Sequence, residues 1–210
     1  NAGGFVSYGG GDITADLGFT QDGKGSSTIG GDIFTTNNSI SFDTGVTLAF
    51  SSVEMSTGDA GAGNIVFKQT LDGGQDLTLT AGTGDITFTG QAGDTTRLGV
   101  VTINEVTDVD ITAGMKLASL YFSDRIDGST GGSGVFTLGG VLDADAGEVL
   151  ISSDQVDLDA SIVASYGQGF AGMVDIIAGA GGVDLASGSN ITTTAAIAGV
   201  DSGDIYIDSV

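Results

Sequence analysis

The chain has 210 residues, among them 38 glycines but no proline, cysteine or histidine, and 27 acidic residues against five basic ones give a net charge of −22. Five scattered bases cannot neutralise a row of phosphates, so nucleic acid is a very poor partner and anionic lipid is disfavoured. Without cysteine or histidine, disulfides, thiolate chemistry, Ser-His-Asp catalysis and histidine-bound metals are excluded.

A Gly-Asp-Ile triplet recurs along the chain. It begins at residues 11, 31, 84 and 203, and the variant Gly63-Asn64-Ile65 resembles it. The intervals from 11 to 31, from 63 to 84 and from 182 to 203 are each roughly 20 residues long. Self-similarity at such a period is typical of a solenoid, in which each repeat forms one coil that stacks on its neighbours.

Short runs of alternating apolar and polar residues predict β-strands, because a period of two places one set of side chains inward and the other outward. Phe42, Phe67 and Phe88 are predicted to point into the core. The apolar pairs of these runs are, in chain order, Ile40/Phe42, Leu77/Leu79, Ile86/Phe88, Val101/Ile103, Val109/Ile111, Val156/Leu158 and Ile205/Ile207.

Two segments depart from this pattern. Residues 115–126 are the best helix candidate, although their Leu120-Tyr121-Phe122 core is equally compatible with a strand. Residues 178–182 are rich in glycine and suggest a sharp corner. Many short strands are also compatible with a sandwich or barrel, but recurrence of similar sequence at nearly equal intervals favours a solenoid.

No stretch has the roughly 20 apolar residues needed to span a bilayer, so membrane insertion is not expected. We expect residues 1–210 to form a single all-β solenoid segment of a longer repetitive chain. Neither end has a clear capping element, which fits either flanking repeats or end-to-end stacking of copies.

Residues 76–90 read DLTLTAGTGDITFTG, followed by LGVVTIN at 98–104 and VDIT at 109–112. This text resembles the repeats of giant filamentous-haemagglutinin-like surface proteins of bacteria, with a good match over about residues 63–160. The resemblance implies a right-handed parallel β-helix, secretion to the cell surface and a role as an adhesin stalk or filament. It identifies no binding residue, because the repeated motif is structural.

Three pairs of aspartates are the candidate metal ligands: Asp108 and Asp110, Asp143 and Asp145, and Asp157 and Asp159. Two residues apart on a strand, both carboxylates of a pair project from the same face. Calcium binds six to eight oxygen atoms, so these pairs are candidate Ca²⁺ ligands. The alternative is a solvated acidic face, and the Gly-Asp turns do not match the register of the calcium-binding nonapeptide repeat.

Catalysis has few candidate groups. A polysaccharide-degrading β-helix enzyme would bring several acids together with Arg97 or Arg125 in a cleft, yet strand alternation alone explains the acid pairs. We therefore expect a non-enzymatic protein. Two threonine pairs, Thr78/Thr80 and Thr87/Thr89, suggest an ice-binding face, although outward threonine is also ordinary in exposed strands.

The sequence thus predicts an extracellular structural or adhesive module. Its expected partners are neighbouring repeats or copies of itself. The alternative is a module that binds glycans or a partner cell, in which an aromatic groove would be expected near Tyr121, Tyr166 or Tyr206.

Overall fold

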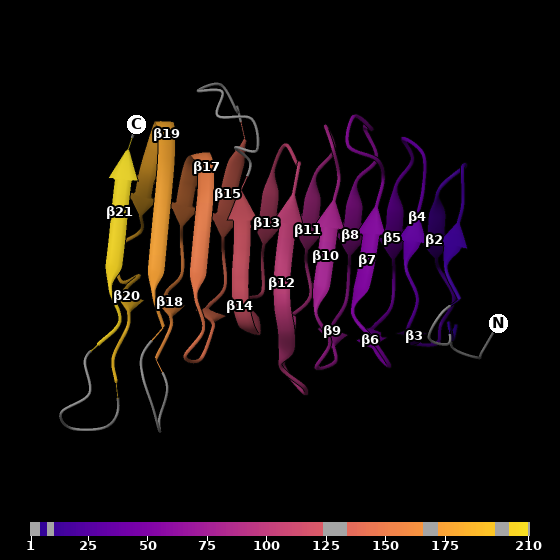
Figure 1. Ribbon diagram of the computed structural model, residues 1–210, viewed down its shortest axis with the longest axis horizontal. Coiled ribbons are helices and arrows are strands. Elements are labelled where there is room, and N and C mark those ends of the chain that lie inside the picture. The colour runs from indigo at the N-terminus through magenta and orange to yellow at the C-terminus, as the bar shows by residue number, and fades with distance from the viewer. Residues whose placement is uncertain (1–4, 8–10, 124–133, 166–171, 196–201, 210) are drawn as a thin grey trace.

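The computed structural model describes residues 5–7, 11–123, 134–165, 172–195 and 202–209, which form 21 β-strands and no helix (Figure 1). Every strand pairing within this part is parallel. The predicted all-β parallel solenoid is therefore confirmed. The described residues contain no helix of the length and apolarity that crossing a membrane requires.

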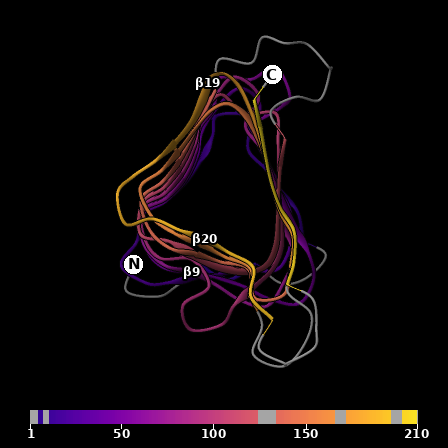
Figure 2. The ribbon, with the colours of Figure 1, turned by 90° about the vertical axis from the view of Figure 1, so that its left-hand side faces the viewer.

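The strands stack in three columns, here called faces, which enclose a roughly triangular interior (Figure 2). Face 1 holds nine of the described strands: β1 (Ile13–Thr14), β4 (Ile33–Phe34), β7 (Val53–Ser56), β10 (Leu77–Thr80), β12 (Leu98–Asn104), β14 (Met115–Ser123), β17 (Val149–Leu158), β19 (Val174–Leu185) and β21 (Ile205–Ser209).

Face 2 is formed by β2 (Phe19–Gln21), β5 (Ile40–Phe42), β8 (Ile65–Phe67), β11 (Ile86–Phe88), β13 (Val109–Ile111), β15 (Val135–Leu138) and the second halves of β17 and β19. Face 3 is formed by β3 (Ser27–Ile29), β6 (Val46–Leu48), β9 (Leu71–Asp72), the first residues of β14, and β16 (Leu142–Asp143), β18 (Ile162–Val163) and β20 (Ile191–Thr192).

The strand register gives the length of each coil, because register partners on face 1 lie one coil apart. One inward column of face 1 passes through Ile13, Ile33, Met55, Leu79, Ile103, Phe122, Ile151, Ile176 and Ile207. The coils up to Phe122 thus lie near the predicted period, and the three that end at Ile151, Ile176 and Ile207 are longer. The right-handed sense of the coil stays a prediction.

One predicted repeat interval is wrong. Ile205 pairs with Val174, whereas Gly182 pairs with Gln155, so residues 182 and 203 are not equivalent positions of successive coils. The spacing between them is a coincidence of a glycine-rich sequence. The intervals from 11 to 31 and from 63 to 84 are real, because Ile13 pairs with Ile33 and Ile65 with Ile86.

The core is filled by the predicted alternating residues. Phe42, Phe67 and Phe88 are buried and stack ring on ring, with centroids 5.4 and 5.2 Å apart. Such parallel neighbours occur because register partners on adjacent coils are held about 4.8 Å apart. Each coil therefore covers the apolar side chains of the previous one, and no coil has a core of its own.

The two uncertain segments are both strands where they are described. Residues 115–123 form β14, which begins on face 3 and continues onto face 1, so the strand alternative is correct there. Residues 124–126 lie outside the described part of the chain. The glycine-rich segment at 178–182 lies within β19 and carries it from face 1 to face 2, with Gly182 at φ +74°.

The Gly-Asp-Ile triplet is explained by contacts between coils. A Cβ atom on Gly31 would lie 2.3 Å from the carbonyl oxygen of Gly11, so only glycine fits there. Asp32 follows and accepts a hydrogen bond from the next coil, at the backbone N–H of Glu54. Ile33 then enters the core with no exposed surface. Each residue of the triplet thus has a separate role in stacking.

Similar hydrogen bonds recur along the solenoid, and in each a short polar side chain accepts from a backbone N–H one coil later. These pairs are Asp12 with Asp32, Ser39 with Asn64, Asn64 with Asp85, Asp76 with Val100, Asp108 with Val135, and Ser119 with Glu148. The acceptor atom of a short side chain stays close to its own backbone. This use agrees with a composition in which only three of the 27 acids are glutamate.

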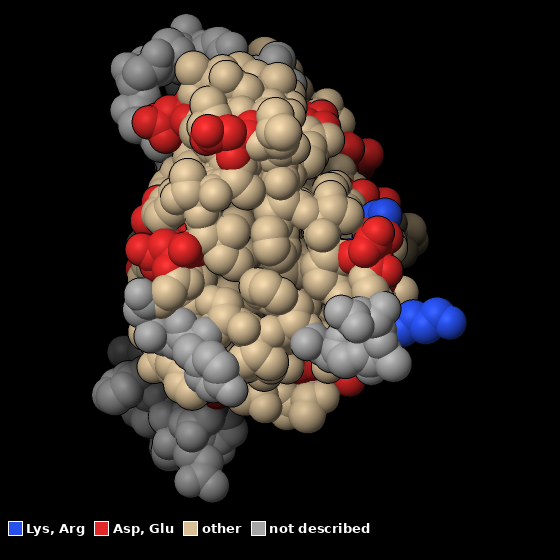
Figure 3. Space-filling view, turned by 90° about the vertical axis from the view of Figure 1, so that its right-hand side faces the viewer, with Lys and Arg blue, Asp and Glu red and all other residues tan. Residues whose placement is uncertain are grey.

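The two ends of the described stack expose apolar surface. Ile205 and Ile207 on β21 are 44% and 54% exposed, whereas their partners Val174 and Ile176 on β19 are fully buried. At the opposite end, Figure 3 shows acidic side chains around the margin of a mostly uncharged surface. On the end surface seen in Figure 3, the acidic side chains therefore lie at the margin rather than over the middle.

Candidate functional site

The first predicted acid pair lies on face 2. Asp108 and Asp110 flank Val109 of β13, and both side chains are exposed. Asp108 accepts a hydrogen bond of 2.8 Å from the N–H of Val135, and Asp110 accepts one of 3.2 Å from the hydroxyl of Thr112. One carboxylate thus supports the next coil, and the other has a local partner.

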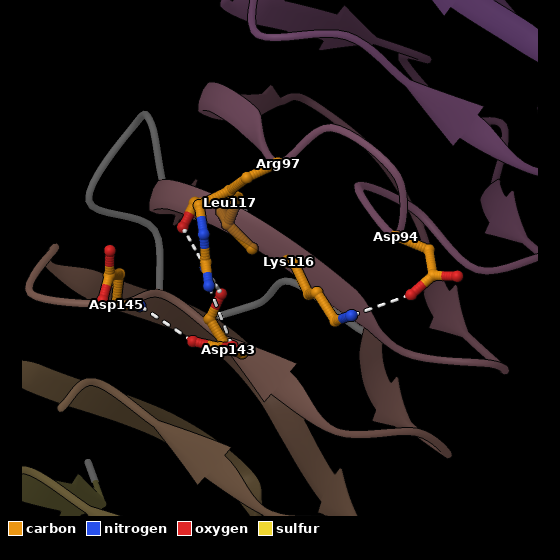
Figure 4. A network of polar contacts seen from close by, with 6 residues as sticks. All are labelled: Asp94, Arg97, Lys116, Leu117, Asp143 and Asp145. Carbon is orange, nitrogen blue, oxygen red and sulfur yellow. Dashed lines mark hydrogen bonds and ion pairs between the residues drawn. The ribbon is translucent and has the colours of Figure 1, made fainter. Parts of the chain in front are cut away.

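The second pair belongs to a network of charges around β14 and β16 (Figure 4). Arg97 reaches across the next coil, where it donates to the carbonyl of Leu117 at 3.0 Å, and its Nη2 donates to the Asp143 carboxylate at 2.9 Å. Asp143 also accepts from the N–H of Asp145. Arg97 therefore links three successive coils through a single side chain.

A second ion pair lies in the same network. Lys116 Nζ is 2.7 Å from Asp94 Oδ1, so two bases on neighbouring coils each engage one acid of another coil (Figure 4). Both ion pairs are partly exposed, and such pairs contribute modestly to stability. Their geometry braces adjacent coils.

The pKa of the Asp143 carboxyl is lowered from its ordinary value. Partial burial acts to raise this pKa, but the hydrogen bond from Arg97, the N–H of Asp145 and the charges of Arg97 and Lys116 together outweigh it. Asp143 is thus held ionised by its partners. A carboxylate in this state is suited to an ion pair and poorly suited to act as a general acid near neutral pH.

The third pair lies at the end of β17, with one acid in the strand and the other after it. Asp157 accepts from Gln155 Nε2 at 2.8 Å, and Asp159 is exposed beyond the end of β17. The register places Asp184 of β19 directly beside Asp157. No local pattern indicates this neighbour, because the two residues belong to different coils and the coils here differ in length.

The six predicted metal ligands therefore lie in three separate places. Among the described residues, no group of three or more aspartate, glutamate, histidine or cysteine side chains is arranged to hold a metal ion. Binding of Ca²⁺ at Asp108, Asp110, Asp143, Asp145, Asp157 and Asp159 stays a prediction. Any ion bound there would need most of its ligands from backbone carbonyls and water.

The threonines do not form one array. Thr78 lies on face 1 between Glu54 and Thr102, whereas Thr87 lies on face 2 between Val66 and Asp110. A flat array on a solenoid needs like residues on successive coils of the same face. The described strands do not provide one for these two pairs.

The alternative of a binding module predicts an aromatic groove near one of three tyrosines, and two of these tyrosines share one column of face 1. Tyr121 of β14, Leu150 of β17, Asp175 of β19 and Tyr206 of β21 are successive register partners on the outward side. We call these four residues the tyrosine column. Tyr166 lies outside the described residues.

Both tyrosine hydroxyls are held by carboxylates. Tyr121 donates to Glu148 Oε2 at 3.0 Å, and Tyr206 donates to Asp204 Oδ2 at 3.2 Å. The pKa of each phenol is raised. The largest cause is the hydrogen bond to Glu148 for Tyr121 and the hydrogen bond to Asp204 for Tyr206. The rings are thus fixed at one end, with Tyr206 53% exposed.

The enzyme alternative places Arg97 or Arg125 among several acids. Arg97 binds one carboxylate, that of Asp143, and Arg125 lies outside the described residues. Comparison with protein-family models, curated proteins and solved structures finds no match for this chain.

Proposed function

We propose that this chain is a non-enzymatic structural module, a segment of rod in a secreted bacterial surface filament or adhesin stalk. The observation that carries this proposal is the uninterrupted register of face 1, in which nine described strands stack over one apolar column. With a spacing of about 4.8 Å between strands, this column spans roughly 40 Å.

The use of the polar side chains supports the same proposal. Asp32, Asn64 and Asp108 bind the backbone of the next coil, and Arg97 ties three coils together. Groups that would be catalytic candidates in another protein are engaged in stacking here. The net charge of −22 keeps such a rod soluble and repels its copies from one another.

The proposal requires stiffness, which can be measured because the chain contains no cysteine. Cysteines introduced at Asp22 and Ser187, both exposed and near opposite ends of the stack, take two spin labels. We expect a narrow distribution of distances between the labels that is unchanged by calcium or by a chelator. A broad distribution in the folded protein would refute the rod.

Self-assembly is tested separately by electron microscopy of the purified chain, first with calcium and then with chelator. Short single rods in both conditions are expected of a spacer segment. Filaments that form with calcium and disperse with chelator would instead identify a self-assembling subunit held by its acidic faces. Release of reducing sugars from polysaccharides would refute the non-enzymatic assignment.

The tyrosine column favours a second candidate function, the binding of an uncharged glycan. Tyrosine rings offer a flat apolar surface with a polar end, and the neighbouring carboxylates Glu148 and Asp204 accept hydrogen bonds from hydroxyl groups. Anionic glycans are disfavoured by the surrounding acids. The three longest coils also join the strands of this column, and insertions in repeat proteins often border the binding face.

Binding to an array of uncharged oligosaccharides tests this second function. We expect weak binding that Tyr206→Ala removes and that Thr78→Ala, on the same outward row but five coils away from Tyr206, leaves unchanged. No binding to any uncharged glycan would refute it, and selective binding of basic peptides would reassign the surface to a cationic protein partner. Neither outcome bears on the stiffness of the rod.

A further inference from the structure

The sequence contains three Asp-Gly dipeptides, and two of them, Asp22-Gly23 and Asp72-Gly73, lie within the described residues. In such a dipeptide the backbone nitrogen of glycine can attack the aspartate Cγ, because glycine has no side chain to block the approach. The reaction needs a free carboxyl group, a free amide N–H and a backbone that can move. The two dipeptides differ in all three respects.

Asp72-Gly73 is held closed. The Asp72 carboxylate accepts from the N–H groups of Thr95 and Thr96 at 2.8 and 3.2 Å, and the Gly73 N–H donates to the carbonyl of Thr96. Asp72 lies in β9, paired with Thr47, and Gly73 is buried. A Cβ on Gly73 would lie 2.2 Å from the Leu48 carbonyl oxygen, so this backbone has no room to move toward its neighbour.

Asp22-Gly23 is open. It lies in the corner between β2 and β3, where Asp22 is exposed and Gly23 is partly exposed. Among the described residues, no hydrogen bond or ion pair involves the Asp22 carboxylate or the Gly23 N–H. The Gln21 side chain does contact this dipeptide, because its Nε2 donates a hydrogen bond of 3.3 Å to the Gly23 carbonyl.

We infer that Asp22-Gly23 is a site of spontaneous isoaspartate formation in the folded protein and that Asp72-Gly73 is protected by the fold. The Gly23 nitrogen bonds to Cγ of Asp22, and the carboxyl OH leaves with the amide proton as water, which closes a five-membered imide. Water then adds to one imide carbonyl. Addition at Cγ restores aspartate, and addition at the Asp22 backbone carbonyl leaves the main chain running through Cγ. One water is released and one consumed, with no oxidant or cofactor.

The modification has a defined structural consequence. It adds one carbon atom to the main chain within the corner that Gln21 holds through the carbonyls of Gly23 and Gly25. Thr44 of the next coil also donates to the Gly25 carbonyl, at 2.8 Å. We therefore expect the lengthened corner to loosen the contact between these two coils while the rest of the stack is unaffected, because each coil contacts only its neighbours.

The test is to incubate the whole folded protein at neutral pH in heavy-oxygen water and to follow isotope uptake and isoaspartate by peptide mapping. Trypsin separates the sites, because cleavage after Lys24, Lys68 and Arg97 releases peptides 1–24 and 69–97. We expect Asp22-Gly23 to convert at least about tenfold faster than Asp72-Gly73, because local opening limits the protected site. In urea the two rates should become similar.

The variant Asp22→Ala assigns the signal. It should abolish isoaspartate in peptide 1–24 without changing the melting temperature, because no described residue bonds to the exposed Asp22 side chain. Equal rates at the two sites in the folded protein would overturn the inference. So would the absence of isoaspartate at Asp22 in the folded chain when it forms in urea, because the corner would then be as protected as β9.

Discussion

Asp32 Oδ1 accepts a hydrogen bond of 2.8 Å from the backbone N–H of Glu54, which lies 22 residues later in the chain and in the next coil of the stack. This bond joins two coils at the corner where both enter face 1. Asp12 and Asn64, at the same position of their triplets, accept in the same way, and each side chain satisfies a backbone donor at the edge of the ladder.

Replacing Asp32 with alanine leaves the Glu54 N–H without this acceptor. We expect Asp32→Ala to lower the free energy of unfolding by about 1–2 kcal/mol, measured by urea denaturation. Asp59→Ala removes an exposed acid from a turn and serves as the control, with an expected effect below about 0.5 kcal/mol. Asp32→Asn retains the acceptor oxygen and should restore most of the loss. If it is as damaging as alanine, charge rather than the hydrogen bond matters.

Gly74 and Gly84, in the two corners that flank β10, should respond to alanine in opposite directions. A Cβ on Gly84 would lie 2.3 Å from the Gly63 carbonyl oxygen, so Gly84→Ala forces the two coils apart and should cost about 1–3 kcal/mol. At Gly74 the nearest atoms would be 4.0 Å away, and Gly74→Ala should stabilise by about 0.4–1 kcal/mol through the unfolded chain. The melting temperatures of both variants test this prediction. Equal changes in melting temperature would contradict the close contact between Gly84 and the Gly63 carbonyl.

The lowered pKa of the Asp143 carboxyl makes the free energy of unfolding depend on pH. Its pKa is lower in the folded protein than its ordinary value of 3.8, so its contribution is fully present above that value and is lost as the pH falls through the folded pKa. We expect Asp143→Asn to be destabilising at neutral pH, with the difference from the unmodified protein shrinking in acid. Asp145→Asn, which keeps a residue suited to its φ of +52°, is the matched control. A difference for Asp143→Asn that is independent of pH would contradict the ion pair with Arg97.

The carboxylates of Asp157 and Asp184 are direct register neighbours and repel each other. Asp184→Asn should therefore raise the free energy of unfolding by about 0.2–1 kcal/mol at low ionic strength, and sodium chloride should reduce this gain. Asp59→Asn changes the net charge equally and should give a smaller gain. If millimolar calcium removes the advantage of Asp184→Asn while magnesium does not, the pair holds calcium in the unmodified protein. Equal effects of both ions would indicate screening alone.

The sequence predicts which side of each strand is buried better than it predicts which strands lie side by side. Alternation at Leu77/Leu79 and at Ile86/Phe88 is a local property of a strand, and it identifies correctly which side chains are buried. Which coil lies beside which depends on the length of every corner in between. Coils of unequal length therefore concealed the pairing of Asp157 with Asp184 and of Ile205 with Val174.

The same reason accounts for the candidate sites. Acid pairs two residues apart, such as Asp108 and Asp110, are apparent in the sequence because their members are close in the chain. The expectation that each pair shares a strand is wrong, since Asp108 precedes β13, Asp145 follows β16 and Asp159 follows β17. The link from Arg97 to Asp143 joins residues 46 positions apart, and the column from Tyr121 to Tyr206 spans several coils of unequal length. A pattern within one strand carries no information on residues so far apart in the sequence, so these arrangements follow only from the strand register.

The stacking of coils also determines how the molecule should yield to force. The hydrogen bonds between strands run along the long axis, so tension on the two ends would load the outermost coil first and leave the next one intact until it is released. A coil of roughly 20–31 residues, once pulled straight, adds about 70–105 Å of contour length. The chain would therefore lengthen in successive small steps rather than rupture at once, and each step would dissipate work.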